Sequence, residues 1–321
     1  MNFWYSFLAI VVLVMLLLPT AAMLVWVERR LLGFWQERLG PNRVGPYGIL
    51  QSLADLIKIL FKHDWIPPFA DAKVFVAAPL MGALAVMMSY AVVPMAPGWV
   101  ISDSHIGLLF FLAMTSLAVY SVLLAGWSSN NKYALIGAMR AAAQTISYEV
   151  FMGLSLLGVV MLAGSFRLSD IVLAQQEGWF ILPQCLGFVL FLIAGIAESH
   201  RLPFDLPEAE TELTAGFHTE YSGIKFALFF LGEYLGVMLI SMMITVLFLG
   251  GWLAPFGLEG FIPPIIWFVL KTFVLISFFI LLRAALPRPR FDQLLAFGWL
   301  WMLPLSLINL LVTAALILGG Q

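Results

Sequence analysis

The chain has 321 residues, of which 62% are hydrophobic and 11% are charged, with a formal net charge of -2 and a mean hydropathy of +1.00. These values lie far outside the usual range of soluble domains. The composition therefore excludes an ordinary water-soluble fold and indicates a polytopic membrane protein.

Eight apolar segments are long enough to cross a bilayer, which takes about 20 helical residues. We predict an all-α integral membrane protein, a single transmembrane domain over residues 1–321. The first segment lacks a basic leader and is followed by Arg29 and Arg30, so we expect it to remain as a helix and not to be cleaved as a signal peptide. The predicted spans cover residues 3–27, 74–95, 105–126, 141–163, 180–198, 226–250, 262–283 and 294–318.

The basic residues predict the orientation of these spans, because the cytoplasmic flanks of membrane helices are enriched in Lys and Arg. Arg167 falls in a loop on one side, and Lys271 falls within a span. All the other Lys and Arg residues share the opposite side, which we interpret as cytoplasmic. We therefore expect both termini to face away from the cytoplasm.

A short amphipathic helix is predicted on the cytoplasmic side, over residues 49–61. Its apolar residues recur every three or four positions, while Asp55 and Lys58 lie on the other face. This segment is too short to cross the bilayer, so we expect it to lie along the interface. Packed against the bundle, it would wall a crevice that a lipid-like molecule can reach; a plain anchor helix is the alternative.

An acidic cytoplasmic loop is predicted over residues 198–223. Its crowded carboxylates repel one another, which raises some of their pKa values toward the working range and favours proton relay. The alternative is a solvated helix start, with Asp205 as its cap and Glu208 at the reciprocal capping position. The carboxylates of this loop are Glu198, Asp205, Glu208, Glu210, Glu212 and Glu220.

Charged residues also fall within the predicted spans, where each costs a few kcal/mol unless it is paired or hydrated. Glu149 and Glu233 are expected roughly 10 Å inside the cytoplasmic boundary of their spans, so that they could be neighbours. Lys271 lies near the middle of its span. With Glu28 and Glu198 at span ends, these residues predict a hydrated funnel from the cytoplasmic loops toward the midplane.

The sequence predicts no cofactor or metal bound by this chain. A single cysteine, Cys185, cannot hold an iron–sulfur cluster that needs four thiolates. No glycine-rich nucleotide-binding motif is present. Any redox centre must therefore belong to a partner. The histidines form no pair at membrane depth that would clasp a haem; they are His63, His105, His200 and His218.

Four long motifs carry a family resemblance. They are WVERRLLGFWQERLGPNRVGPYGILQSLADLIK (26–58), GWSSNNKYALIGAMRAAAQTISYEVFMGLSL (126–156), the ESHRLPFDLPEAETELTAGFHTEYSG loop and LRAALPRPRFDQL (282–294). In this order the chain resembles the H-type membrane subunit of NADH-quinone oxidoreductase, the bacterial counterpart of the mitochondrially encoded subunit 1 of respiratory complex I. The resemblance implies a multi-pass protein of the bacterial cell inner membrane, with its termini on the periplasmic side.

The resemblance also implies a function: such a chain helps to form the chamber in which ubiquinone is reduced, and it couples that reduction to proton translocation. Flavin and iron–sulfur clusters would belong to partner subunits. The implied partners are the peripheral-arm subunits at the quinone site and the small membrane subunits that lead to antiporter-like subunits, with membrane lipid and no nucleic acid. The residues that we expect at the quinone chamber are Glu28, Arg29, Asp55, Arg201 and Asp205. Those that we expect in the proton relay are Glu149, Glu198, Glu208, Glu210, Glu212, Glu220, Glu233 and Lys271.

Three alternatives belong to other classes. The first is the membrane subunit of a related energy-converting hydrogenase, which would share the acidic loop and the spans but not necessarily a quinone. The second is a stand-alone proton-coupled transporter, although no internal inverted repeat is visible. The third is a structural anchor, which leaves Glu149 and Glu233 without a role.

Overall fold

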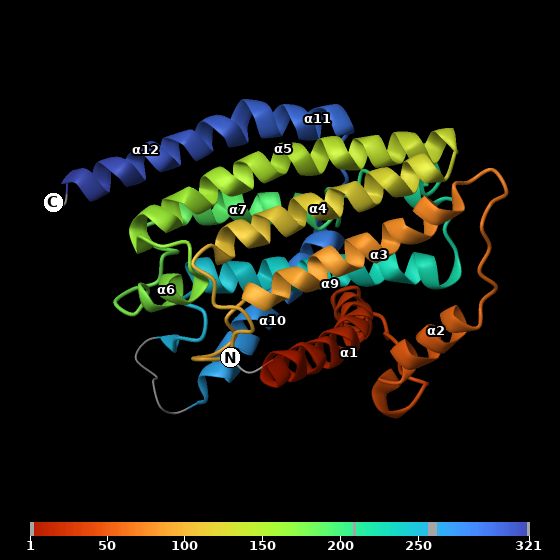
Figure 1. Ribbon diagram of the computed structural model, residues 1–321, viewed down its shortest axis with the longest axis horizontal. Coiled ribbons are helices and arrows are strands. Elements are labelled where there is room, and N and C mark those ends of the chain that lie inside the picture. Colours follow the sequence, from red (N-terminus) through yellow and green to blue (C-terminus); the bar gives the residue numbers. More distant parts are fainter. Residues whose placement is uncertain (1–2, 208–209, 256–261, 320–321) are drawn as a thin grey trace.

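The computed structural model describes residues 3–207, 210–255 and 262–319, and in these residues all the regular secondary structure is helical apart from one isolated β-bridge between Ala96 and Trp99 (Figure 1). Three short 3-10 turns, η1 to η3, cover Pro46–Gly48, Tyr90–Val92 and Gly216–His218. The α-helices are α1 (Phe3–Trp35), α2 (Gln51–Leu60), α3 (Ala72–Ser89), α4 (Gly107–Ser128), α5 (Lys132–Ala163), α6 (Leu168–Leu173), α7 (Cys185–Glu198), α8 (Glu210–Leu213), α9 (Gly223–Phe248), α10 (Pro264–Ala285), α11 (Phe291–Phe297) and α12 (Leu303–Gly319).

Seven helical segments in the described part of the chain are long and apolar enough to cross a membrane. They correspond to seven of the eight predicted spans and confirm an integral membrane protein built from helices. The segments are Phe7–Trp35, Ala72–Val92, Gly107–Ser128, Lys132–Ala163, Gly223–Phe248, Pro264–Ala285 and Phe291–Gly319.

The remaining predicted span, 180–198, is shorter than expected. Only α7 is helical there; its 14 residues extend about 21 Å, less than the roughly 30 Å of a hydrocarbon core. The residues before it form turns, and the buried Gln184 side chain bonds to Asn309 and Thr313 of α12. Apolar α7 nevertheless packs between α5, α9 and α12.

Helix α5 begins earlier than the predicted span at 141. The Asn131 side chain accepts a hydrogen bond from the Tyr133 N–H at 3.0 Å and caps the helix there. Polar residues that interrupt the apolar pattern belong to α5, and they are tolerated there because they form hydrogen bonds within the protein. Gln144, for example, is fully buried and donates to the carbonyls of Ala197 and Phe204.

The amphipathic helix predicted at 49–61 is present as α2, beside α1 and α9 (Figure 1). None of its residues is buried within the chain. Its apolar side chains, among them Leu53 and Leu60, remain about half exposed. This exposed apolar face is what an interfacial helix requires.

Helix α9 contributes the most buried residues to the main apolar core and packs against α1, α3, α7 and α10 (Figure 1). Its second half, from Tyr234 to Phe248, is almost continuously buried. Side chains at the start of this stretch therefore face neighbouring helices instead of lipid.

The last span contains a π-helical turn, Gly298–Met302, between α11 and α12. A Cβ atom on Gly298 would lie 2.7 Å from a Phe151 ring carbon, so only glycine allows α5 to approach this closely. The buried residues of the span follow a spacing of four before a single step of three; they are Leu294, Gly298, Met302, Ser306, Asn309 and Thr313.

Candidate functional site

Arg201 joins two carboxylates that are far apart in the chain. It lies in the loop after α7, and its guanidinium nitrogens lie 3.8 Å from Glu28 Oε2 on α1 and 3.4 Å from Glu233 Oε2 on α9. These three side chains are only 8% to 13% exposed. Removing one member would leave a buried charge without its partner, which typically costs about 3–5 kcal/mol. The cluster is therefore a fixed part of the structure.

A second arginine completes this charge cluster. Arg283, near the end of α10, donates to Glu28 Oε1, so Glu28 contacts two guanidinium groups. Burial alone would lower the pKa of Arg201, but the charges of Glu233 and Glu28 outweigh burial and hold that pKa above its ordinary value. Arg201 therefore stays positively charged.

Tyr234 packs against the same arginine. Its ring centre lies 4.2 Å from the guanidinium carbon of Arg201, a cation–π contact. Its hydroxyl also interacts with Glu28. The ring lines a small pocket with Glu28 and Arg283, and it also lines a larger crevice on the other side.

The larger crevice lies between α1, α2 and α9 and has a volume of about 510 Å³. Its polar part is fixed by an ion pair at 2.7 Å between Arg29 and Asp55, and Gln51 also donates to Asp55. The rest of its wall is almost entirely apolar, and Tyr234 lies among the lining residues. The apolar lining includes Ala21, Ala22, Val25, Leu56, Ile59, Leu60, Ile224, Phe226, Ala227, Leu228, Phe230 and Leu231.

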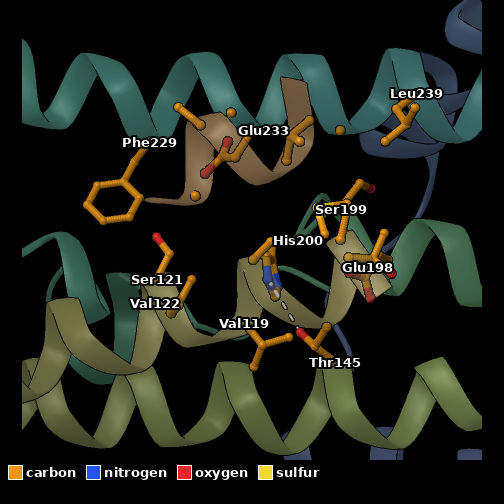
Figure 2. A pocket seen from close by; sticks show the side chains of 18 of the residues that line it. Val119, Ser121, Val122, Thr145, Glu198, Ser199, His200, Phe229, Glu233 and Leu239 are labelled. Atoms are coloured by element: carbon orange, nitrogen blue, oxygen red, sulfur yellow. Dashed lines mark hydrogen bonds between the residues drawn. The ribbon is translucent and has the colours of Figure 1, made fainter. Parts of the chain in front are cut away.

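A separate cavity of about 100 Å³, which we call the internal cavity, lies between α3, α4 and α9 and the loop after α7. Figure 2 shows Glu233 on one side of it, with Thr145, Glu198 and His200 grouped on the other. The dashed line there marks the 3.5 Å contact between Thr145 Oγ1 and His200 Nε2. A water molecule needs roughly 10–15 Å³ of such space, so this cavity has room for several.

Glu149 does not line this cavity but interacts with it through Glu198. Its carboxylate accepts a hydrogen bond from Ser116 of α4 at 2.8 Å, and its charge repels that of Glu198. Glu149 and Glu233 were expected to be neighbours. In the structure, Glu198 links them: it shares the cavity with Glu233 and the electrostatic interaction with Glu149.

The other carboxylates of the acidic loop are held apart by separate partners. Asp205 accepts from Arg288 at 2.9 Å, Glu212 from Arg140 at 2.5 Å, and Glu220 from Asn131 at 2.7 Å. The expectation that Asp205 caps a helix is wrong, because Leu206 and Pro207, which would be the first residues of that helix, are not helical, and Asp205 is bound to Arg288. Glu208 lies outside the described residues, and the structure describes only the backbone of Glu210.

Lys271 lies apart from these groups. Its ammonium donates to the carbonyls of Leu249, Gly251 and Leu253, which follow the C-terminus of α9, and it lies 4.3 Å from the centre of the Trp179 ring. Twelve residues separate it from Arg283 along α10, or about 18 Å. Lys271 was expected to belong to the funnel, but it lines none of the cavities that contain Glu28, Glu198 or Glu233.

Sequence reasoning did not identify Tyr234, His200 and Arg283 as site residues. Tyr234 follows Glu233 directly in α9. Adjacent residues of a helix point about 100° apart. When Glu233 faces one cavity, Tyr234 therefore faces a different neighbour. His200 lies between Glu198 and Arg201, both of which were identified. The position of His200 between these two residues was the signal in the sequence that could have identified it.

Comparison with known proteins identifies the family. A family model described as NADH dehydrogenase matches residues 8–314. The H-type subunit of NADH-quinone oxidoreductase from Methylococcus capsulatus is 62% identical to the chain over 295 residues, which make up 92% of each chain. These matches do not favour a hydrogenase subunit, a transporter or an anchor. The chain therefore belongs to the family of H-type subunits of NADH-quinone oxidoreductase, which are membrane subunits of respiratory complex I, and it is one subunit of that oxidoreductase.

Proposed function

We propose that the crevice between α1, α2 and α9 forms part of the ubiquinone chamber, and that the Arg201 cluster couples quinone reduction to proton translocation. Ubiquinone has a polar head group and a long apolar tail. The crevice offers matching chemistry, because its walls are apolar and its polar part carries Arg29 and Asp55. Ligand sites of this kind combine an apolar lining with a few placed polar groups.

The position of Arg201 carries this proposal. It contacts Tyr234, which lines the crevice, and Glu233, which lines the internal cavity. Reduction of a quinone to a quinol consumes two protons, so the charge near the crevice changes during each turnover. A change in the charge of Glu28 alters how strongly Arg201 is drawn to Glu233, and coupled carboxylates transmit such a change through their pKa values.

The proposed relay leaves the cluster through the internal cavity. A proton released at Glu233 would cross to Glu198, and the interaction of Glu198 with Glu149 would carry the charge change to α5. From there the relay would pass sideways to the small membrane subunits. The peripheral-arm subunits, which would hold the flavin and the iron–sulfur clusters, would face the quinone side.

We also propose that the chain lies in the bacterial inner membrane with both termini in the periplasm. The distribution of arginines supports this orientation, because Arg167 and the group of Arg201 and Arg283 have separate sets of partners. Arg167 contacts His105, and it lies 3.9 Å from both Asp103 and Asp170, in the segments that precede α4 and form α6. Arg201 and Arg283 lie together in the cluster with Glu28.

The test uses membranes that carry the assembled complex with Glu28→Gln or Glu233→Gln. Each change keeps the side-chain shape and removes the charge. We expect NADH to quinone turnover and proton pumping to fall together, on the order of 10²-fold for the loss of a proton-transfer group. NADH oxidation by an artificial acceptor that takes electrons from the peripheral arm should stay normal.

Glu177→Gln is the matched control, because Glu177 is exposed and lines none of the described cavities. It should leave all three activities unchanged. Normal quinone turnover and normal pumping in both Glu28→Gln and Glu233→Gln, in fully assembled complex, would overturn the proposed coupling.

A further inference from the structure

We propose that His200 carries protons across the internal cavity, from Glu233 to Glu198. This inference rests on the proposed function and extends it, because it identifies the group that connects two carboxylates on different walls. The sequence pattern predicts no role for His200 other than a position in a loop.

The placement of His200 is the first observation. It lines the cavity together with Glu233, which comes from α9, and with Glu198, which ends α7. Figure 2 shows its ring on the Glu198 side of the cavity, with one nitrogen near Thr145 of α5 and Glu233 on the opposite side. No other histidine lines this cavity among the described residues.

The backbone of His200 is the second observation. Its φ is +49°, in the left-handed region that residues other than glycine rarely adopt. Such a conformation costs on the order of 1–3 kcal/mol and persists only where the surroundings impose it. Ser199 is anchored to the end of α7 through its N–H, and Arg201 is held by Glu28 and Glu233. The two fixed neighbours impose the turn that directs the imidazole into the cavity.

The chemistry of the lining is the third observation. Most side chains around the cavity are apolar, and the described lining residues include no Lys or Arg. The titratable groups that face His200 are Glu198 and Glu233, while Thr145 and Thr115 offer hydroxyls. A positive imidazolium would thus face two carboxylates, of which Glu233 is also paired with Arg201 outside the cavity lining, and this negative surrounding favours its formation during transfer.

The transfer balances without any further reactant. Protonated Glu233 gives its proton, directly or through one water, to one ring nitrogen of neutral His200. The imidazolium then releases the proton from its other nitrogen to the Glu198 carboxylate. Glu233 is left ionised and Glu198 neutral, and rotation of the ring restores the starting tautomer. Histidine suits this role because its two nitrogens exchange protons near neutral pH.

The experiment uses the assembled complex with His200→Gly or His200→Asn. Glycine accepts the positive φ without strain and opens a space for a free imidazole ring. Asparagine keeps a polar side chain but cannot pass protons. We expect NADH to quinone turnover to fall on the order of 10²-fold in both variants, with artificial-acceptor activity intact. Added imidazole should restore turnover and pumping in His200→Gly, whereas furan, a ring of similar size without a basic nitrogen, should not.

His105→Asn is the matched control, since His105 contacts Arg167 and does not line the cavity; it should behave as the unchanged complex. Normal turnover in both His200 variants would overturn the inference. Loss of turnover in His200→Gly that imidazole does not reverse would also overturn it, because the residue would then be structural. If Glu233→Gln and Glu198→Gln still abolish pumping in those cases, the proposed function survives; if they do not, it fails as well.

Discussion

Glu233 and Tyr234 are consecutive residues of α9, yet they line different cavities. Glu233 faces the internal cavity with Glu198 and His200, whereas Tyr234 faces the apolar crevice and the pocket around Glu28. One peptide unit therefore separates the proposed quinone side from the proposed proton side. Arg201 contacts both side chains, so a change of charge on one side acts on the other side through a single guanidinium group.

Tyr234→Phe should weaken quinone use without loss of assembly. The ring over Arg201 remains, but the hydroxyl that interacts with Glu28 is removed. A hydrogen bond to a charged group contributes roughly 1.5–3 kcal/mol, so we expect a rise in the KM for quinone on the order of tenfold. Tyr221→Phe is the control, because the Tyr221 hydroxyl donates to the Phe75 carbonyl, away from the crevice. Equal KM values in the two variants would contradict the prediction.

The ion pair of buried Lys225 and exposed Asp64 should fix α2 at the crevice. Lys225 Nζ lies 2.6 Å from Asp64 Oδ2, and Asp64 follows α2 closely in the chain. Since Asp64 is 34% exposed and water can reach it once Lys225 is removed, Lys225→Ala should cost less than the roughly 3–5 kcal/mol of a broken buried pair. Faster proteolysis within α2 of the assembled complex would report this loss.

The double variant Asp64→Lys with Lys225→Asp should slow that proteolysis again, because it restores opposite charges. Arg290→Ala is a matched control. Arg290 and Asp292 form an exposed pair, and such pairs contribute about 0–1 kcal/mol. If Arg290→Ala exposes α2 as much as Lys225→Ala does, the assignment of Lys225 as an anchor is wrong.

Lys271→Met tests whether Lys271 belongs to the relay. Its ammonium binds three carbonyls that follow α9, so its removal leaves polar groups unsatisfied. We expect less assembled complex and a lower melting temperature, with the ratio of protons pumped to electrons unchanged in the complex that does assemble. Lys271→Arg should recover part of the stability. A lower pumping ratio at normal assembly would instead return Lys271 to the proton path.

Gly298→Ala should destabilise the contact between α5 and the last span. The added methyl group would lie 2.7 Å from a Phe151 ring carbon. Overpacking of this kind costs about 1–3 kcal/mol, which thermal unfolding of the complex would detect. Gly153→Ala in α5 is the control, because a Cβ at that position meets nothing within 4 Å. Equal melting temperatures for the two variants would show that α5 yields at this contact.

Hydropathy alone located the long spans, since each needs only a run of apolar residues. It placed the start of α5 too late, because it treated Arg140 as the boundary of an apolar segment, although Arg140 lies inside the helix and is paired with Glu212. The charged residues within and beside the spans also identified Glu28 and Glu233 as important, and the family resemblance added Arg201. Their meeting depends on contacts between α1, α9 and a loop far apart in the chain, which local pattern does not encode.

Lys271 shows a second limit of prediction from sequence, which concerns contacts to main-chain atoms. A lysine in mid-span indicates a charge that needs a partner, but backbone carbonyls carry no sequence signature. The three carbonyls that bind it follow α9, where Gly250 and Gly251 both have positive φ values. Only the folded backbone gathers acceptors there. The sequence therefore predicted a place for Lys271 in the proton relay and could not predict that main-chain carbonyls would surround it.

The π-helical turn in the last span explains a periodicity that an ordinary helix does not allow. Residues four apart on an α-helix are offset by about 40°, so three such steps from Leu294 to Ser306 would wind the buried stripe about 120° around the axis. A π turn holds roughly one extra residue and rewinds the helix by about 100°. The stripe thus stays aligned with α5 and α7, and Asn309 meets Gln184. Deleting one residue within Gly298–Met302 would therefore turn this stretch into an ordinary α-helix and leave α12 in phase, whereas deleting one residue elsewhere in the span, with the π turn kept, would rotate α12 by about 100°.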